Sequence, residues 1–153
     1  MILSKEIAVY LNLAACKLKQ YTAAAMKQCN LDLTPEQFLL IDILWNQGPM
    51  SQQKIADTML KDKNSVTKLV DAMERNGFVV RERCTEDRRS NIVNLTEKAE
   101  KMKLGAKEAG ISMLDKILEG IEEDELHDFL GTLAKICDNM GLHMEISSKY
   151  YNL

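Results

Sequence analysis

The sequence is poor in residues that interrupt helices, with only two prolines and seven glycines among its 153 residues. Leu, Ala, Lys, Glu and Met, which have high helix propensity, are frequent, so the composition predicts a mostly helical chain. Long apolar runs are also missing. None approaches the roughly 20 residues of a membrane-spanning helix, and the N-terminus has no signal-peptide pattern. We therefore expect a cytoplasmic protein with no membrane partner, of a length that suits one domain or a small domain with an oligomerisation arm.

The signatures of common enzyme sites are absent. There is no glycine-rich phosphate loop, no G-x-S-x-G or H-E-x-x-H motif, and no plausible nucleophile–base pair at short range. Four cysteines, at positions 16, 29, 84 and 137, form no C-x-x-C pair and no zinc-like spacing, which favours free thiols in a reducing compartment. Acids flank His127, but without a supporting His or Cys spacing a surface helix is the better interpretation. We predict no enzymatic activity, no metal and no cofactor.

Basic residues are not in excess, yet the charge is unevenly distributed. The net charge is −3 overall, but it is +2 over residues 1–33, zero over residues 34–96 and −5 over residues 97–153. This balance argues against a generic nucleic-acid coat, which depends on bulk positive charge. The middle of the chain still holds nine Lys and Arg residues, enough for a small, placed set of cations to contact DNA.

Both ends of the chain predict long helices with apolar seams. Residues 3–28 repeat apolar positions at spacings of four and three, which is typical of a coiled-coil-like contact. From Thr96 a second helix repeats small and apolar residues through Met102 to Met113, and a final helix begins in the acidic run 122–125. These seams pack either within the chain or against a second copy. The positions that we expect in a dimer interface are Ile7, Leu11, Leu18, Leu126, Phe129, Leu133 and Met140.

Local signals between these ends predict two further helices. Thr34 and Gln37 can form a capping box with Pro35 at the first helical position, so that a helix begins there and ends near Gly48. Ser51 can cap a second, shorter helix that runs to about Leu60.

The stretch from Asp62 to Gly77 predicts the helix around which the middle of the chain is organised. Its apolar residues from Val66 onward fall at i, i+3, i+4 and i+7, Asp62 can cap the start, and Gly77 permits a left-handed stop. The exposed front carries compact polar side chains able to contact base edges and phosphates: Lys63, Asn64, Ser65, Thr67 and Lys68. Taken alone, such a helix is most often a surface helix with a solvated polar face.

After Gly77 the pattern changes from helical to alternating. Residues 78–83 and 92–95 predict two strands, joined by a charged, turn-like segment at 85–90. Two short helices joined by a tight turn, the second with a polar front, are typical of a helix-turn-helix. A hairpin directly behind such a unit forms a wing.

The segment Asp87–Thr96 resembles the wing of the MarR family of bacterial transcription regulators. The family pattern D-x-R-x-x-x-V-x-L-T is met at Asp87, Arg89, Val93, Leu95 and Thr96, and the stretch from Val66 to Val79 is similar to the family's recognition helix. The resemblance covers nearly the whole chain, although the outer helices match only in pattern and length. It implies a mainly α fold with a small β-wing: a winged helix-turn-helix DNA-binding domain over residues 34–96, flanked by dimerisation helices over residues 1–33 and 97–153.

The resemblance also implies a homodimer on pseudo-palindromic operator DNA, with its recognition helices about 34–36 Å apart. It places five residues in or beside the major groove: Lys63, Asn64, Ser65, Thr67 and Lys68. There Asn64 can pair with adenine and Lys68 with guanine, each worth about 1–3 kcal/mol of discrimination. Ser51 and Gln52 become candidates for phosphate contacts.

At the wing tip the resemblance assigns Arg88 and Arg89 to DNA. Arg89 occupies the position from which the family inserts an arginine into the minor groove, where width and negative potential are read. Asp87 is expected to orient Arg89 by an ion pair. The other interpretation of Arg89 is a solvated turn arginine.

Many proteins of this family bind a small effector, so the resemblance implies a repressor released by a ligand or a stress signal. Tyr10, Met26, Phe38 and Trp45 could line a cavity but serve equally well as core, and none is assigned to a ligand. Some relatives carry a reactive thiol in the first helix, but we expect Cys16 to be buried and inert. Cys84 is the more exposed candidate.

A winged helix that only docks another protein, without specific DNA binding, is the alternative function. The net acidity of the chain favours it. The arginine-tipped wing and the polar helix front argue against it.

Overall fold

The computed structural model describes residues 2–83 and 91–143 of the chain. These residues divide into two compact units, with the division between Leu114 and Asp115. None of the described helices combines the length and the apolar composition that crossing a membrane requires.

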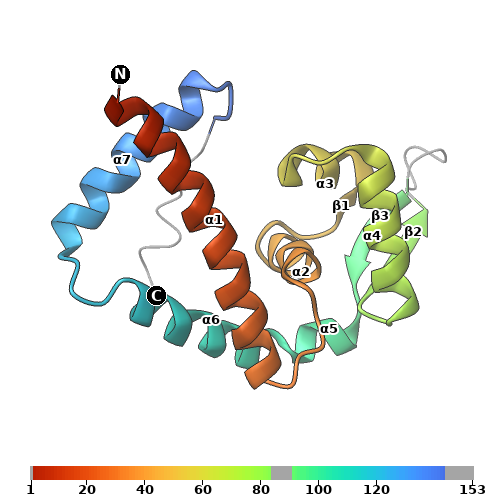
Figure 1. The fold of residues 1–153 in the computed structure, drawn as a ribbon. Helices are drawn as coiled ribbons and strands as arrows, with labels where there is room; N and C mark the ends of the chain where they lie inside the picture. The colour runs from red at the N-terminus through yellow and green to blue at the C-terminus, as the bar shows by residue number, and fades with distance from the viewer. Residues whose placement is uncertain (1, 84–90, 144–153) are drawn as a thin grey trace. The chain divides into compact units, whose positions relative to one another are not determined.

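The first unit contains all three strands and most of the helices (Figure 1). In chain order its elements are α1 (Ile2–Gln28), α2 (Pro35–Gln47), β1 (Met50–Ser51), α3 (Gln52–Met59), α4 (Lys63–Arg75), β2 (Val79–Arg83), β3 (Asn91–Leu95), α5 (Glu97–Lys101) and α6 (Lys103–Ile117), whose last residues lie beyond the division. The second unit holds α7 (Glu123–Asn139). The mainly helical fold with a small β-wing is confirmed.

The ends of α2 and α3 are capped by the residues expected from the sequence. Thr34 Oγ1 accepts from the Gln37 N–H at 3.2 Å, and Gln37 Oε1 accepts from the Thr34 N–H at 2.9 Å, which completes the capping box of α2. Gly48 ends that helix with a backbone φ of 79°, a value that residues with a Cβ atom rarely adopt. Ser51 caps α3 by accepting from the Lys54 N–H at 3.2 Å. Short-range hydrogen bonds therefore set the boundaries of the helices in the middle of the chain.

The sheet has three antiparallel strands in the order β1-β3-β2. The predicted hairpin is β2 and β3, in a register that places Val79 opposite Leu95 and Arg83 opposite Asn91. The third strand, β1, pairs Met50 with Val93 and was not predicted. A strand of two residues is too short for an alternating pattern, so only its pairing with β3 reveals it.

The core of the first unit lies where α2, α3, α4 and the sheet meet (Figure 1). Val66, Val70 and Met73, three of the four residues in the apolar stripe of α4, are fully buried. They pack in one cluster with residues from the other elements, including Leu40, Ile41, Ile55, Val79 and Val93. Burial of this stripe turns the opposite, polar side of α4 outward.

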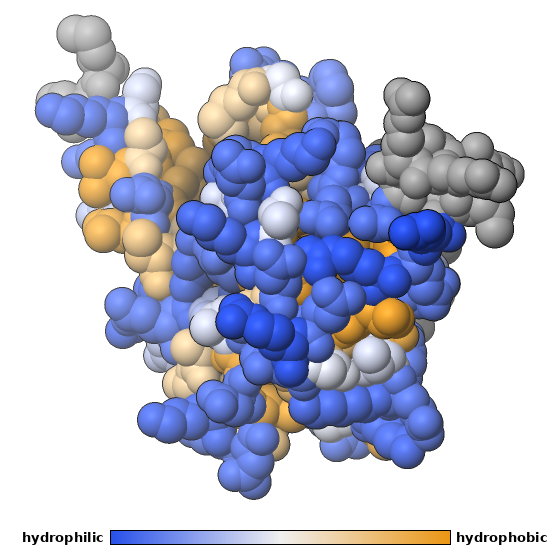
Figure 2. Space-filling view, turned by 90° about the vertical axis from the view of Figure 1, so that its right-hand side faces the viewer, coloured by the Kyte–Doolittle hydropathy of each residue, from blue (hydrophilic) through white to orange (hydrophobic). Residues whose placement is uncertain are grey.

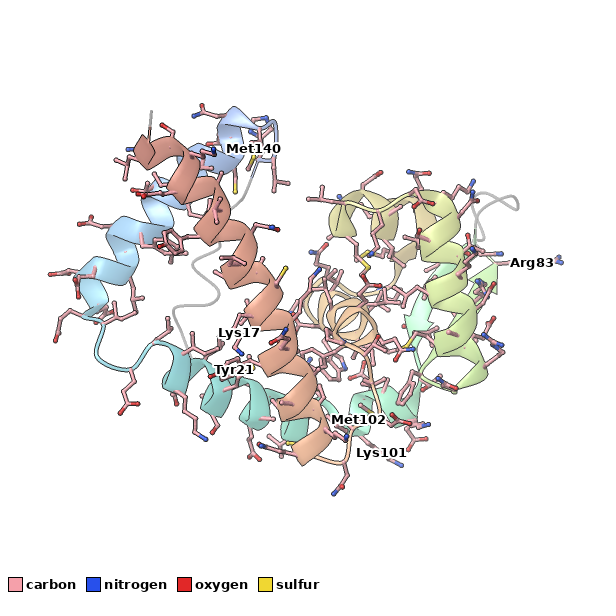
Figure 3. All side chains as sticks on the ribbon, in the orientation of Figure 1. Lys17, Tyr21, Arg83, Lys101, Met102 and Met140 are labelled. Carbon is pink, nitrogen blue, oxygen red and sulfur yellow. The ribbon has the colours of Figure 1, made fainter. Side chains whose placement is uncertain are left out.

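The single helix expected from Thr96 is interrupted at Met102, which separates α5 from α6 (Figure 3). The Met102 N–H donates to Ala99 O at 3.2 Å, a three-residue step, and regular bonding resumes when the Ala106 N–H donates to Met102 O at 3.0 Å. The apolar repeat continues across the break because a tighter turn changes the helix phase only slightly. Periodicity alone therefore could not locate this boundary.

The long terminal helices expose much of their apolar surface within this chain. Leu18 of α1 is 44% exposed, and Phe129 of α7 is 56% exposed. Of the described residues of α7, only Cys137 is buried. Cys16 is exposed on α1, so the expectation that it is buried is wrong for this chain. Most of α1 is exposed, because few other residues of the chain pack against it.

Candidate nucleic-acid interface

The first turn of α4 is held by Asp62 and Ser65. Asp62 Oδ1 accepts from the Ser65 N–H at 2.9 Å, and Asp62 Oδ2 accepts from the Ser65 hydroxyl at 2.6 Å. These bonds stabilise the carboxylate and lower the pKa of Asp62 from its ordinary value of 3.8, with the Ser65 hydroxyl as the larger cause. Asp62 is therefore the N-cap predicted for this helix, and Ser65 is its partner.

Three predicted DNA contacts face outward from α4. Lys63, Asn64 and Lys68 are exposed, and their side chains make no hydrogen bond or ion pair within residues 2–83 and 91–143. The face of the molecule over α4 and the strands is largely hydrophilic (Figure 2). Two lysines and an amide in this position offer donors to phosphates and base edges, and one acceptor to an adenine amino group.

Other predicted contacts are engaged within the protein. Thr67 Oγ1 donates to Lys63 O at 2.9 Å and accepts from Gln52 Nε2 at 3.2 Å, so its hydroxyl links α4 to α3. Ser51 is used as the cap of α3. These residues lie beside the outward front, and their hydrogen bonds first of all hold the helix-turn-helix together.

Arg81 of β2 bonds to both helices of the helix-turn-helix and was not predicted as a site residue from the sequence. Its Nε donates to Gln52 Oε1 at 3.1 Å, its Nη1 pairs with Glu74, and its Nη2 pairs with Asp71. Glu74 Oε1 also accepts from the Arg81 backbone N–H at 3.1 Å. Asp71 and Glu74 are three residues apart, a spacing that places both acids on one side of a helix, and this was the only sequence signal for the site.

A second set of contacts closes the far end of α4. The Thr96 hydroxyl donates to Gly77 O at 2.7 Å, and Lys98 Nζ donates to Asn76 O at 2.8 Å. The Lys98 ammonium also lies 4.1 Å from the centre of the Phe78 ring. Thr96 of the wing motif and Lys98 are thus bonded to the residues that directly follow α4.

The predicted wing-tip residues Asp87, Arg88 and Arg89 lie outside the described residues, as does Cys84. The described part of the wing ends at Arg83, whose side chain projects away from the end of β2 (Figure 3). Arg83 is exposed and adds a cation beside the strand that leads to the tip.

The four residues considered as the lining of a ligand cavity do not form a common site. Tyr10 is exposed on α1, whereas Met26 is fully buried. Phe38 and Trp45 pack edge to face with their ring centres 6.2 Å apart, and Trp45 Nε1 is buried without a partner in the described part of the chain. Among the described side chains, no three His, Cys, Asp or Glu residues converge as a metal ion would require.

Comparisons with known proteins agree on the family. The sequence profile of the MarR family matches residues 33–91. The HTH-type transcriptional regulator YfiV of Bacillus subtilis is 34% identical over 112 residues, which cover 71% of this chain and 70% of that protein. The chain belongs to the MarR family.

Solved structures share the fold of this chain. A MarR family protein from Bacillus stearothermophilus is 28% identical, with a TM-score of 0.72 over 91% of this chain and 96% of that one. Reduced AbfR, solved bound to DNA, has a TM-score of 0.77 at 24% identity, over 92% of this chain and 95% of that one.

The MarR family consists of transcriptional regulators, which are not enzymes. This MarR-family chain is therefore a DNA-binding transcriptional regulator, and the comparisons do not support the alternative of a winged helix used only for protein docking. Within it, α3 and α4 form the helix-turn-helix, and β2 and β3 form the described part of the wing.

Proposed function

We propose that this MarR-family regulator is a repressor that binds pseudo-palindromic operator DNA as a homodimer and is released by a small ligand or a stress signal. The observation that carries the proposal is a set of exposed polar side chains on α4 that make no hydrogen bond or ion pair within the described residues. Lys63, Asn64 and Lys68 project from a helix whose other side packs into the core through Val66, Val70 and Met73, so their direction is set by the core. AbfR has the same fold and has been solved on DNA, which supports a DNA-facing role for this surface.

Specificity is assigned to two of these residues. Asn64 can donate to and accept from the edge of an adenine in the major groove, and Lys68 can donate to the O6 and N7 acceptors of a guanine. Lys63 lies at the start of the helix, where a phosphate contact would also benefit from the helix dipole. Phosphate contacts by Ser51 and Gln52 remain predictions, subordinate to the internal bonds that these residues make.

The homodimer is supported by the exposed apolar residues of the terminal helices. Ile7, Leu18, Phe129 and Met140, four of the seven predicted interface positions, are exposed, while Leu11, Leu126 and Leu133 are half-buried. Exposed large apolar residues recur along α1, α6 and α7, as expected for helices that pack against a partner. A two-fold partner that covers these helices would present two recognition helices to one duplex.

The effector is proposed from family membership alone. Where it binds is not assigned, because Tyr10, Met26, Phe38 and Trp45 do not line a common cavity in the described residues.

Fluorescence anisotropy on the DNA immediately upstream of the protein's own coding region tests the proposal. We expect binding that exceeds binding to a random duplex of the same length by roughly 1,000-fold or more at moderate salt. Candidate effectors are then titrated into the complex, and release of the DNA identifies the ligand. Equal affinity for upstream DNA, other promoter fragments and random DNA would reject a specific operator function.

The wing assignment has its own test. We expect Arg89→Ala to weaken operator binding and to reduce the slope of log affinity against log salt by about one. The reason is that one fewer cationic side chain neutralises the DNA phosphates. Lys101→Ala, in an exposed ion pair with Glu97 of α5, is the matched control. An unchanged slope and affinity for Arg89→Ala would show that Arg89 is a solvated turn residue.

A further inference from the structure

Arg81 ties three elements of the winged helix-turn-helix to one another. The guanidinium belongs to β2, Gln52 to α3, and Asp71 and Glu74 to α4. The Arg81 side chain is 18% exposed, whereas Asp71 is 51% exposed and Glu74 is 40% exposed. The cation is covered, and the two carboxylates that hold it remain open to solvent.

The main chain of Arg81 takes part in the same cluster. β2 is an edge strand, because the sheet order is β1-β3-β2. On the open side of this strand the Arg81 N–H donates to Glu74 Oε1 at 3.1 Å, which satisfies a donor that an unprotected edge would leave for another chain. Glu74 thus holds both the backbone and the side chain of Arg81, so β2 cannot slide along α4 without breaking several bonds.

We propose that the Arg81 cluster, defined as Gln52, Asp71, Glu74 and Arg81, is a positioning device for DNA specificity. It holds the strand that carries the wing and the helix that enters the major groove at one mutual angle, so that both elements read the same duplex together. A planar guanidinium fixes the directions of its partners, which a point charge cannot do. In this role Arg81 acts through its partners rather than through a phosphate, because its Nε, Nη1 and Nη2 each bond to one of Gln52, Glu74 and Asp71. The proposal rests on the operator binding proposed above.

Asp71→Ala separates positioning from electrostatics, because the two effects have opposite signs. Removing this carboxylate from α4 removes a charge that repels phosphate, so electrostatics alone would tighten binding to every DNA. A loosened wing strand would instead weaken operator binding and leave binding to random DNA equal or stronger. We expect the ratio of operator affinity to random-DNA affinity to fall roughly tenfold.

Arg81→Lys provides the second variant, since it keeps the charge and removes the fork of donors. We expect the same fall in the affinity ratio, with binding to random DNA unchanged, because the net charge is conserved. Glu82→Ala is the matched control: it removes an exposed acid from the adjacent position of β2 and should leave the ratio at the wild-type value.

All affinities are measured by fluorescence anisotropy at one salt concentration and at a temperature where thermal unfolding shows each variant to be folded. An unchanged ratio in Asp71→Ala or in Arg81→Lys, while the wild-type protein discriminates, overturns the positioning role alone. A wild-type protein that does not distinguish operator from random DNA rejects the proposed function, and the positioning role with it.

Discussion

Adjacent residues in the first turn of α4 serve different purposes. Asp62 and Ser65 bond to each other and hold the start of the helix. Asn64, between them, and Lys68, one turn later, leave their polar atoms to the outside. Residues that hold the start of the helix therefore alternate with residues that we propose to contact DNA, and each class should respond to mutation in its own way.

Replacing Asn64 should change which base is preferred rather than whether the protein folds. We expect Asn64→Ala to lower discrimination at one base position of each half-site by about 1–3 kcal/mol, because a bidentate amide contact is lost. A selection of binding sites from random DNA measures this. Asn76→Ala, at the opposite end of the same helix, is the control and should select the wild-type motif. If Asn64→Ala also selected the wild-type motif, Asn64 would have no part in base recognition.

Asp62 should make the stability of the fold depend on acid pH. Its carboxyl has a lowered pKa in the folded state, so its contribution to stability is complete above the unfolded pKa near 3.8 and is lost as the pH falls through the lower, folded value. Asp62→Asn keeps a capping side chain that does not titrate, and should lose this dependence. Urea unfolding at a series of pH values below about 5, followed by the fluorescence of Trp45, the only tryptophan, measures the difference. Parallel pH profiles for the two proteins would contradict the assignment.

At the scale of elements, the turn between α4 and the hairpin is closed by the start of α5. The Thr96 N–H donates to Phe78 O at 3.0 Å, and the Thr96 hydroxyl donates to Gly77 O at 2.7 Å. Thr96 also accepts from the Ala99 N–H at 3.4 Å as the cap of α5. One threonine thus joins a helix end, a strand end and a helix start.

We expect Thr96→Val to lower the free energy of unfolding by about 1–2 kcal/mol, because a half-buried carbonyl and a helix N–H each lose a partner. Thr58→Val is the control: its hydroxyl bonds only to Lys54 O within the same helix, and its loss should cost less. Urea unfolding at one protein concentration compares them, since the stability of an oligomer depends on concentration. Equal effects of the two substitutions would contradict the joining role of Thr96.

At the scale of the whole molecule, the described chain leaves much apolar surface uncovered. Phe129 and Leu130 of α7 are both exposed, although the helix has a clear apolar side. The middle of the chain instead has a core of buried apolar residues. The core therefore leaves the terminal helices partly uncovered, and the proposed second copy would cover them.

Placing a charge on this surface should dissociate the dimer. We expect Phe129→Asp to shift the sedimentation coefficient from dimer to monomer at micromolar concentration and to weaken operator binding, because two recognition helices no longer act together. Leu60→Asp is the control for sedimentation alone, since Leu60 is also exposed and apolar but lies outside the terminal helices, in the turn between α3 and α4. A wild-type protein that sediments as a monomer would contradict the homodimer.

The local features of the fold could be predicted because their causes are short-range. The Thr34 capping box, the Asp62 cap, the stripe from Val66 to Met73 and the stop at Gly77 all depend on residues within about two helical turns, where the spacing of residue types is enough. The alternating pattern predicted the two hairpin strands in the same way, and the wing motif together with the stretch from Val66 to Val79 predicted the family. The sequence by itself therefore determined the position of the helix-turn-helix and of the hairpin, and the type of protein.

The tertiary structure alone decided which distant side chains meet. Gln52 and Arg81 are 29 residues apart, and no period or spacing predicts that they bond. The pairing of Met50 with Val93, the break at Met102 and the exposure of α1 and α7 likewise depend on how elements pack. The physical reason is range: caps and amphipathic stripes are set by neighbours along the chain, whereas ion pairs across elements exist only after the core has fixed the positions of those elements.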